Sequence, residues 1–181
     1  MRNSSMKNKI ICLAFAFILS PVSAHNSQDS FFELVKSHCG KIYFGKTVFP
    51  TDKNDPFVDK VLKMTVKDCN ESVIRIPFQV GDDTSRTWIL TKTEKGLLFK
   101  HDHRLPDGSA DPVTLYGGFG NESGTNLIQY FPADADTKIL IPAAKSNVWS
   151  LKFDKELNQF IYYLERNNKP RYRAIFDLQN K

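Results

Sequence analysis

The sequence predicts an all-β protein, an antiparallel meander of about ten strands with a short helix near the N-terminus. Short segments with alternating apolar and polar residues follow one another through most of the chain, as is typical of strands. Clusters of Gly, Pro, Asp and Asn separate them at short intervals. The connections are too short for crossover helices, so neighbouring strands should pair antiparallel. We expect the sheet to close into a barrel, which removes exposed edges; a β-sandwich is the alternative.

Residues 1–24 have the pattern of a secretory signal peptide. Basic residues precede an apolar run at 10–19, which is too short to span a bilayer, and small residues follow at the expected cleavage site. We expect cleavage before His25, which leaves a single domain at 25–181. No later stretch is long and apolar enough to form a membrane anchor.

The charge of the predicted mature domain is close to neutral. The whole chain has a formal net charge of +5, and the signal segment contributes three of those charges through Arg2, Lys7 and Lys9, so +2 remains. A nearly neutral domain does not favour nucleic acid or an anionic membrane as a partner. The sequence also predicts no cofactor.

Cys39 and Cys69 remain after cleavage, and a pair of cysteines in an exported chain predicts a disulfide. The alternative is a redox or metal-binding pair. A C-x-x-C spacing is absent and only His38 lies close in sequence, so we favour the disulfide.

The N-terminal helix is predicted from a capping box at Ser30-Phe31-Phe32-Glu33. Phe31, Leu34, Val35 and His38 follow at helical spacing, and Gly40 is placed to stop the helix. We expect this helix to cover one end of the fold, with His38 at the helix end.

Ten segments are predicted to be strands: 41–49, 61–68, 72–80, 86–93, 97–104, 113–116, 126–131, 148–153, 159–165 and 171–178. The exception to the β pattern is 132–141, where Asp134 or Asp136 would cap a short helical turn.

The clearest hairpin joins 86–93 to 97–104 through Glu94-Lys95-Gly96. On the returning strand His101 and His103 share one face with Leu97 and Phe99, because side chains alternate. The strand begins apolar on both faces and ends charged on both faces. We therefore expect it to run from the core to a rim, followed by a turn at Pro106-Asp107-Gly108 and a bend at Gly117-Gly118.

Several segments resemble a group of small exported bacterial proteins that have no assigned activity. They are Cys39-Gly40-Lys41, Ile74-Arg75-Ile76-Pro77-Phe78, Arg86-Thr87-Trp88 with Leu90-Thr91, Lys100-His101-Asp102-His103-Arg104, Asp107-Gly108 with Asp111, Tyr116-Gly117-Gly118 and Phe131-Pro132-Ala133-Asp134. This resemblance implies a bacterial, periplasmic or extracellular protein. The architecture also resembles the calycin barrels (lipocalins, fatty-acid-binding proteins and nitrobindins). The G-x-W start of lipocalins is absent, and Cys39-Gly40-Lys41-Ile42-Tyr43 stands near its place.

His101 and His103 lie two residues apart, so both imidazoles point to the same side of a strand and are weak candidates for a metal site. A third ligand would have to come from Asp107, Asp111 or His25. The alternative, which we favour, is that both histidines hydrogen-bond to loop carboxylates at the rim. We accordingly predict no metal.

Two arginines lie in alternating strands and are candidates for holding an anionic ligand head. In a barrel, an inward Arg75 or Arg173 would do so, as the calycin resemblance implies; an outward position is the alternative favoured by base rates. With His101, His103, Arg104 and Asp107 they form the predicted ligand-binding set. We expect Asp102, Arg104, Asp107 and Asp111 to form a salt-bridged loop cluster.

The sequence favours an exported barrel that binds a small apolar or amphipathic ligand, because 12% of its residues are aromatic and could line a pocket. The alternatives are a metal-dependent enzyme centred on His101 and His103, and an envelope or surface protein without small-molecule activity. Known hydrolase, metalloprotease and P-loop motifs are absent, so catalysis is not favoured.

Overall fold

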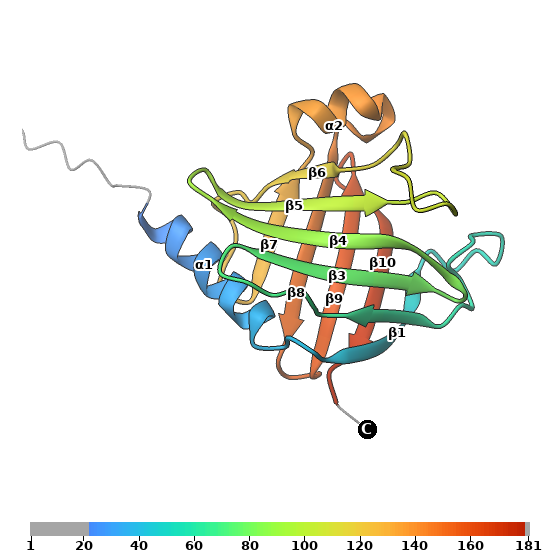
Figure 1. Ribbon diagram of the computed structural model, residues 1–181, viewed down its shortest axis with the longest axis horizontal. Coiled ribbons are helices and arrows are strands. Elements are labelled where there is room, and N and C mark those ends of the chain that lie inside the picture. Colours follow the sequence, from blue (N-terminus) through green and yellow to red (C-terminus); the bar gives the residue numbers. More distant parts are fainter. Residues whose placement is uncertain (1–21, 180–181) are drawn as a thin grey trace, which may run out of the picture.

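The computed structural model describes residues 22–179, and it confirms the all-β prediction. Ten antiparallel strands form one sheet that curls into a nearly closed barrel (Figure 1). The predicted signal peptide lies outside the described residues up to position 21. Within the described part of the chain, no helix is long and apolar enough to cross a membrane.

The strands are β1 (Ile42–Phe49), β2 (Leu62–Thr65), β3 (Val73–Val80), β4 (Asp83–Thr93), β5 (Gly96–His103), β6 (Tyr116–Phe119), β7 (Ile128–Pro132), β8 (Asn147–Asp154), β9 (Gln159–Arg166) and β10 (Lys169–Asp177). The helices are α1 (Val22–Lys36), α2 (Ala135–Leu140) and the 3-10 turn η1 (Pro142–Ala144). Nine of the ten predicted strands coincide with these elements to within a few residues.

The strand order is β6-β5-β4-β3-β2-β1-β10-β9-β8-β7, so each strand pairs with its sequence neighbour and β1 pairs with β10. The remaining seam lies between β6 and β7. Backbone hydrogen bonds cross it from Asp134 to Gly117 and from Asn121 to Tyr130, each 2.9 Å long. A Cβ on Gly118 would lie 1.9 Å from the Pro132 carbonyl oxygen, so the seam requires glycine there.

The prediction of a strand at 113–116 is wrong. Strand β6 runs through both glycines, while Leu115 before it has φ of 56° and interrupts the extended chain. The physical reason is close approach. A Cβ on Gly117 would lie 2.0 Å from the Phe99 carbonyl oxygen, so glycine allows β6 to pack against its neighbours.

The inside of the barrel is filled by aromatic side chains. Trp88 stacks on Phe78 at a centroid distance of 4.5 Å and on Tyr162 at 4.7 Å, and all three are buried. An interior cavity lined by Val35, Tyr43 and other core residues has a volume of about 10 Å³, roughly that of one water-sized probe. This space does not admit a small organic ligand.

Helix α1 closes one end of the barrel, as predicted (Figure 1). Phe31 and Phe32 are buried in the core, and the Gln28 side chain accepts from the Leu97 amide and donates to the Gly120 carbonyl. The helix begins at Val22, so the predicted start at Ser30 is wrong. The two hydrogen bonds of Gln28 hold the first turns of α1 against the barrel. A capping motif is local, so it does not reveal such a long-range contact.

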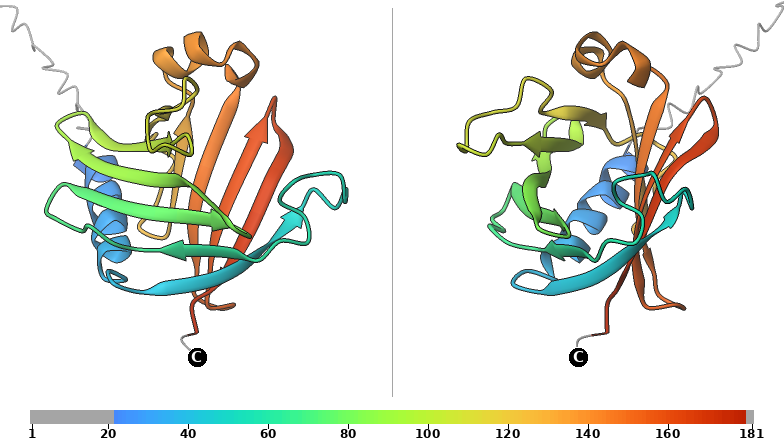
Figure 2. Two further views of the ribbon diagram at one scale, coloured as in Figure 1. Left: turned by 45° about the vertical axis from the view of Figure 1, so that its right-hand side comes forward. Right: turned by 90° about the vertical axis from the view of Figure 1, so that its right-hand side faces the viewer.

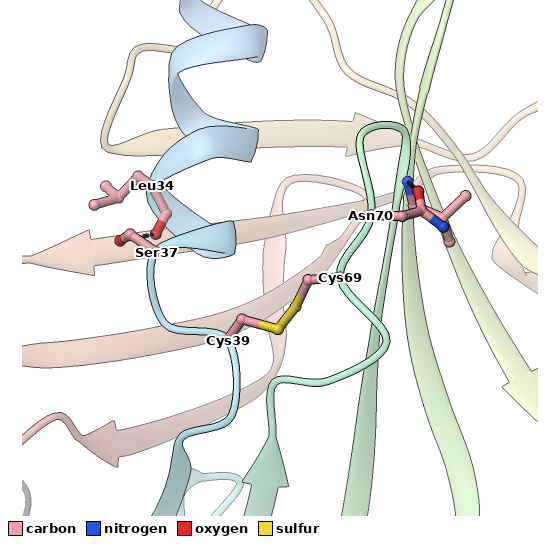
Figure 3. Close-up of a disulfide and its surroundings, with 6 residues drawn as sticks. Leu34, Ser37, Cys39, Cys69 and Asn70 are labelled. Atoms are coloured by element: carbon pink, nitrogen blue, oxygen red, sulfur yellow. Dashed lines mark hydrogen bonds between the residues drawn. A yellow bond between two sulfur atoms is a disulfide. The ribbon is translucent and has the colours of Figure 1, made fainter.

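Cys39 and Cys69 form the predicted disulfide. Figure 3 shows Cys39 just after helix α1 and Cys69 in the connection from β2 to β3. The bond fixes the plugging helix to the barrel wall. The separation of 30 residues corresponds to a stabilisation of about 3.5 kcal/mol in the chain-entropy account.

Asp134 caps helix α2, as the sequence predicted. Its carboxylate accepts from the Thr137 amide at 2.9 Å and pairs with Lys100 of β5 at 2.5 Å. The Thr137 hydroxyl donates to the Gly117 carbonyl and accepts from the Gly117 amide, both at 2.8 Å. These contacts hold α2 over the β6–β7 seam.

Candidate functional site

His101 and His103 project from β5 toward the same side, as alternation requires. His101 is only 3% exposed, and its ring stacks on Tyr116 with a centroid distance of 4.6 Å. Asp102 is also buried, so the strand does not reach the rim at these residues. The expectation that both histidines are exposed rim residues is therefore wrong for His101, which is part of the core.

The hydrogen bonds of His101 determine its tautomer. Its Nδ1 lies 3.1 Å from the Tyr116 carbonyl oxygen, which can only accept, so Nδ1 carries the proton. In a neutral imidazole Nε2 is then the acceptor, and the Tyr162 hydroxyl donates to it at 2.9 Å. Both ring nitrogens are thus occupied, and neither is available to a metal.

Burial holds these groups in their neutral forms. It lowers the pKa of His101 to about 3, although the hydrogen bond to Tyr116 acts in the opposite direction. Burial likewise raises the pKa of Tyr116 to about 12 and that of Tyr162 well above its usual range. The cluster is a neutral, internally satisfied network, which suits it to packing rather than to proton transfer.

His103 lies nearer the solvent and is half-buried. Its Nε2 is 3.1 Å from the Tyr116 hydroxyl. Burial lowers the pKa of His103, with a further contribution from Arg86, while nearby carboxylates including Asp111 act oppositely. No three His, Cys, Asp or Glu side chains in the described part of the chain converge on a possible metal position. The side chain of His25, one nominal third ligand, lies outside the described residues.

The predicted loop cluster is smaller than expected. Arg104 donates to Asp102 through two nitrogens at 3.0 and 3.1 Å, and Asp102 also accepts from the Thr114 hydroxyl at 3.2 Å. Asp107 instead accepts from the backbone and hydroxyl of Ser109 within an exposed turn, which lowers its pKa. Arg104 and Asp102 therefore hold the loop against β5, and Asp107 shapes its tip.

Arg75 and Arg173 both lie on the outer surface of the barrel. Their strand neighbours Ile74, Ile76, Tyr172 and Ala174 are buried inside, so alternation turns the arginines outward. Neither arginine can hold a ligand head within the barrel. The outward orientation is the alternative that base rates favoured from the sequence.

A hollow of about 640 Å³ lies on the outer face of the sheet, over β7, β8, β9, β10 and the end of β1. The right-hand view of Figure 2 shows β8–β10 nearly edge on, with α1 and β2–β5 together on the inner side. We call the hollow the outer groove; it is lined by Val48, Phe49, Ile128, Tyr130, Ser150, Lys152, Ile161, Tyr163, Pro170 and Arg173. Its volume falls in the range of small-molecule sites, about 300–1,000 Å³.

Strand register explains the hollow. Tyr130, Ser150, Tyr163 and Arg173 lie side by side on successive strands, in one row across the sheet. Ser150 is the smallest of the four, and it is 4% exposed although it faces outward. Tyr130 and Tyr163 lie two strands apart, which separates their backbones by about 10 Å. A single layer of carbon atoms in contact with a ring on each side needs about 7.5 Å between the two rings. The two tyrosines therefore flank a slot with Ser150 at its floor, and the low exposure of Ser150 shows that this slot is narrow.

A second row deepens the apolar character of the groove. Ile128, Lys152 and Ile161 are cross-strand neighbours there, and Ile161 is 5% exposed. Lys152 pairs with Asp154 at the end of β8, at 3.0 Å. The groove thus has an apolar floor, and its lysine already has an acidic partner.

Arg173 has no such partner. It makes no ion pair or hydrogen bond with any residue between 27 and 179 whose side chain the structure describes. Burial raises the pKa of its cross-strand neighbour Tyr163, Glu165 adds to this, and Arg173 opposes it. Arg173 is therefore a solvent-exposed cation at the groove whose guanidinium is not paired with another described side chain.

The sequence contains a signal for this groove in strand β9. The run Phe160-Ile161-Tyr162-Tyr163-Leu164 is apolar on both faces of its strand. A barrel strand with one solvated face should alternate instead. Apolar residues on both faces predict that the outer face is covered or binds something. Of the predicted ligand-binding set, the groove contains only Arg173.

In the comparisons with known proteins, no protein-family model, no curated protein and no solved structure matches this chain. The nearly closed ten-strand barrel is consistent with a calycin-like architecture.

Proposed function

We propose that this chain is exported to the periplasm or exterior of a bacterial cell, where it binds a small apolar or amphipathic molecule in the outer groove. The signal-peptide pattern at 1–24 and the Cys39–Cys69 disulfide support export, because disulfides persist in oxidising compartments. The observation that carries the binding proposal is the groove itself, with its volume of about 640 Å³ and mostly apolar lining.

Packing supports a position of the site outside the barrel wall. Inside the barrel, Trp88 and Tyr162 are buried and stacked on each other, which reduces the room for a ligand there. Outside, Ser150 leaves a slot between two tyrosines. A molecule in that slot would bury apolar surface, which contributes about 25 cal/mol per Å² removed from water.

The metal-dependent enzyme has less support as an alternative. It would need His101 to give up its hydrogen bond with Tyr116 or with Tyr162 in order to coordinate an ion. Both bonds are buried, and each leaves an unpaired polar atom when broken.

The proposal is tested by filling the slot. The neutral fluorescent amphiphile N-phenyl-1-naphthylamine is titrated into the protein and into Ser150→Phe, whose new ring would occupy the space between Tyr130 and Tyr163. We expect the fluorescence enhancement to be lost in the variant. Native mass spectrometry of the exported protein would in parallel report any co-purified molecule.

The matched control is Thr91→Phe on β4. Thr91 lies in mid-sheet on the outer face, between Val73 and Leu98, and away from the groove. The control should bind as the parent does, and both variants should keep the parent's circular dichroism spectrum. Equal binding by parent and Ser150→Phe, with both folded, would rule out the outer groove as the site.

A further inference from the structure

The outer groove joins an apolar slot to a cation that has no acidic partner, and this combination restricts its ligand. Arg173 stands directly beside Tyr163 in the register of β9 and β10, at the end of the row that contains the slot. On the other side of Arg173, β1 contributes Phe49, which is 39% exposed. A guanidinium flanked by aromatic side chains thus lies at one end of the apolar floor.

The other charges of the groove do not neutralise this guanidinium. Lys152 adds a second positive charge, which Asp154 offsets through their ion pair. Glu165 affects Tyr163, but it forms no ion pair with Arg173. An approaching anion therefore meets one cation whose donors are unused and whose fork matches two oxygens of an oxyanion.

We propose that the outer groove selects a free, single-chain amphiphile with an oxyanion head, such as a carboxylate. Its apolar chain lies over Ile128 and Ile161 on the groove floor, and its head receives the Arg173 guanidinium. This inference rests on the proposed function, because it assigns the ligand class of the same groove. The groove volume of about 640 Å³ is in the range of small-molecule sites, so a free amphiphile fits it better than the paired chains of a membrane lipid.

The test compares three ligands with the same chain and different heads: dodecanoate, dodecanol and dodecyltrimethylammonium, each below its micelle concentration. Each is titrated against protein loaded with N-phenyl-1-naphthylamine, and displacement gives its Kd. Dodecanoate should bind roughly tenfold more tightly than dodecanol, because a charge-assisted bond to Arg173 is added. The trimethylammonium should bind most weakly. The dodecanoate preference should shrink as salt rises.

The decisive variant is Arg173→Gln, with Arg75→Gln as its matched control. Arg75 is also an exposed arginine on the outer face of a strand, and it does not line the groove. Arg173→Gln should lose the preference for dodecanoate and keep the affinity for dodecanol, whereas Arg75→Gln should behave as the parent. A preference that survives in Arg173→Gln would overturn the inference.

Other outcomes separate this inference from the proposed function. If dodecanoate and dodecanol bind alike, and both are lost in Ser150→Phe, the groove binds ligands but does not select anions. If Ser150→Phe changes none of the affinities, the groove is not the site and both proposals fail. Binding to phosphatidylglycerol vesicles without binding of free dodecanoate would overturn the inference in favour of a membrane surface.

Discussion

The inner and outer faces of strands β7–β10 are both rich in aromatic residues, yet they differ in how their polar groups are used. On the inner face, Tyr162 donates to His101, and His101 donates to a backbone carbonyl. On the outer face, Tyr163 and Arg173 are neighbours, and the arginine side chain forms no hydrogen bond or ion pair with another described side chain.

This difference separates groups that maintain the fold from groups available for binding. Polar atoms with partners inside a packed core stabilise one conformation and offer nothing to a ligand. A hollow with apolar walls and an unpaired cation leaves both burial and hydrogen bonding to be completed by a partner. The functional candidate is therefore the face with unused interactions, even though the inner face contains more perturbed pKa values.

The largest expected effect is on the inner face. Replacing His101 by Ala should destabilise the protein by about 4 kcal/mol, because it leaves a cavity and an unpaired Tyr162 hydroxyl. Urea unfolding followed by tryptophan fluorescence measures this change. The variant His101→Phe fills the cavity, and adding Tyr162→Phe removes the orphaned hydroxyl, so stability should recover stepwise. A stable His101→Ala protein would contradict the assignment of His101 to the core.

The inner face should also make the protein sensitive to acid. The pKa of His101 is about 3 in the folded state, whereas it should be near 6.5 in the unfolded chain. The stabilisation that neutral His101 gives to the folded state is therefore complete above pH 6.5. It is lost as the pH falls toward 3, because only the unfolded state takes up the proton in this range.

Protonation of His101 in the unfolded chain lowers the free energy of unfolding by at most about 1.4 kcal/mol for each pH unit below 6.5. Urea unfolding at pH 7, 6, 5 and 4 measures it as the difference between the parent and the double variant His101→Phe/Tyr162→Phe. The parent should lose stability faster below pH 6.5. Parallel curves for the two proteins would mean that His101 is protonated in the fold or already exposed.

The smallest effect on stability is expected on the outer face. Tyr163→Ala should cost about 1 kcal/mol or less, because the side chain is partly exposed and cross-strand pairs contribute 0.2–1 kcal/mol. The same change removes one wall of the slot, so binding of N-phenyl-1-naphthylamine should fall while the melting temperature shifts by a few degrees. If the protein instead unfolds, the outer face is part of the core and the contrast between the faces disappears.

Sequence patterns predicted most of the fold because strand periodicity is local. The hairpin turn at Gly96 and the Asp134 cap follow from nearby residues and their spacing, and the Cys39–Cys69 bond follows from the pair of cysteines that remains in an exported chain. The path of β6 could not be predicted, because Gly117 is accommodated by its distance to Phe99 on another strand. Long-range contact, rather than local propensity, decided that element.

The candidate site was harder to predict for the same reason. Alternation alone assigns each of four residues to one face of its own strand: Tyr130, Ser150, Tyr163 and Arg173. It does not show that four separate strands bring them into one row, since this depends on register across the sheet. Histidine is a common metal ligand, so residue type alone made His101 and His103 candidates. The burial that makes His101 part of the core depends on closure of the barrel, which residue type does not reveal.

The central claim, that the ligand site lies outside the barrel wall, is tested most directly by isoleucine methyl NMR. Ile128 and Ile161 line the outer groove, whereas Ile74 and Ile76 are buried inside the barrel. Titration with N-phenyl-1-naphthylamine should shift the methyl signals of Ile128 and Ile161 and leave those of Ile74 and Ile76 in place. Shifts at Ile74 and Ile76 without shifts at Ile128 and Ile161 would contradict the account and place the ligand within the barrel.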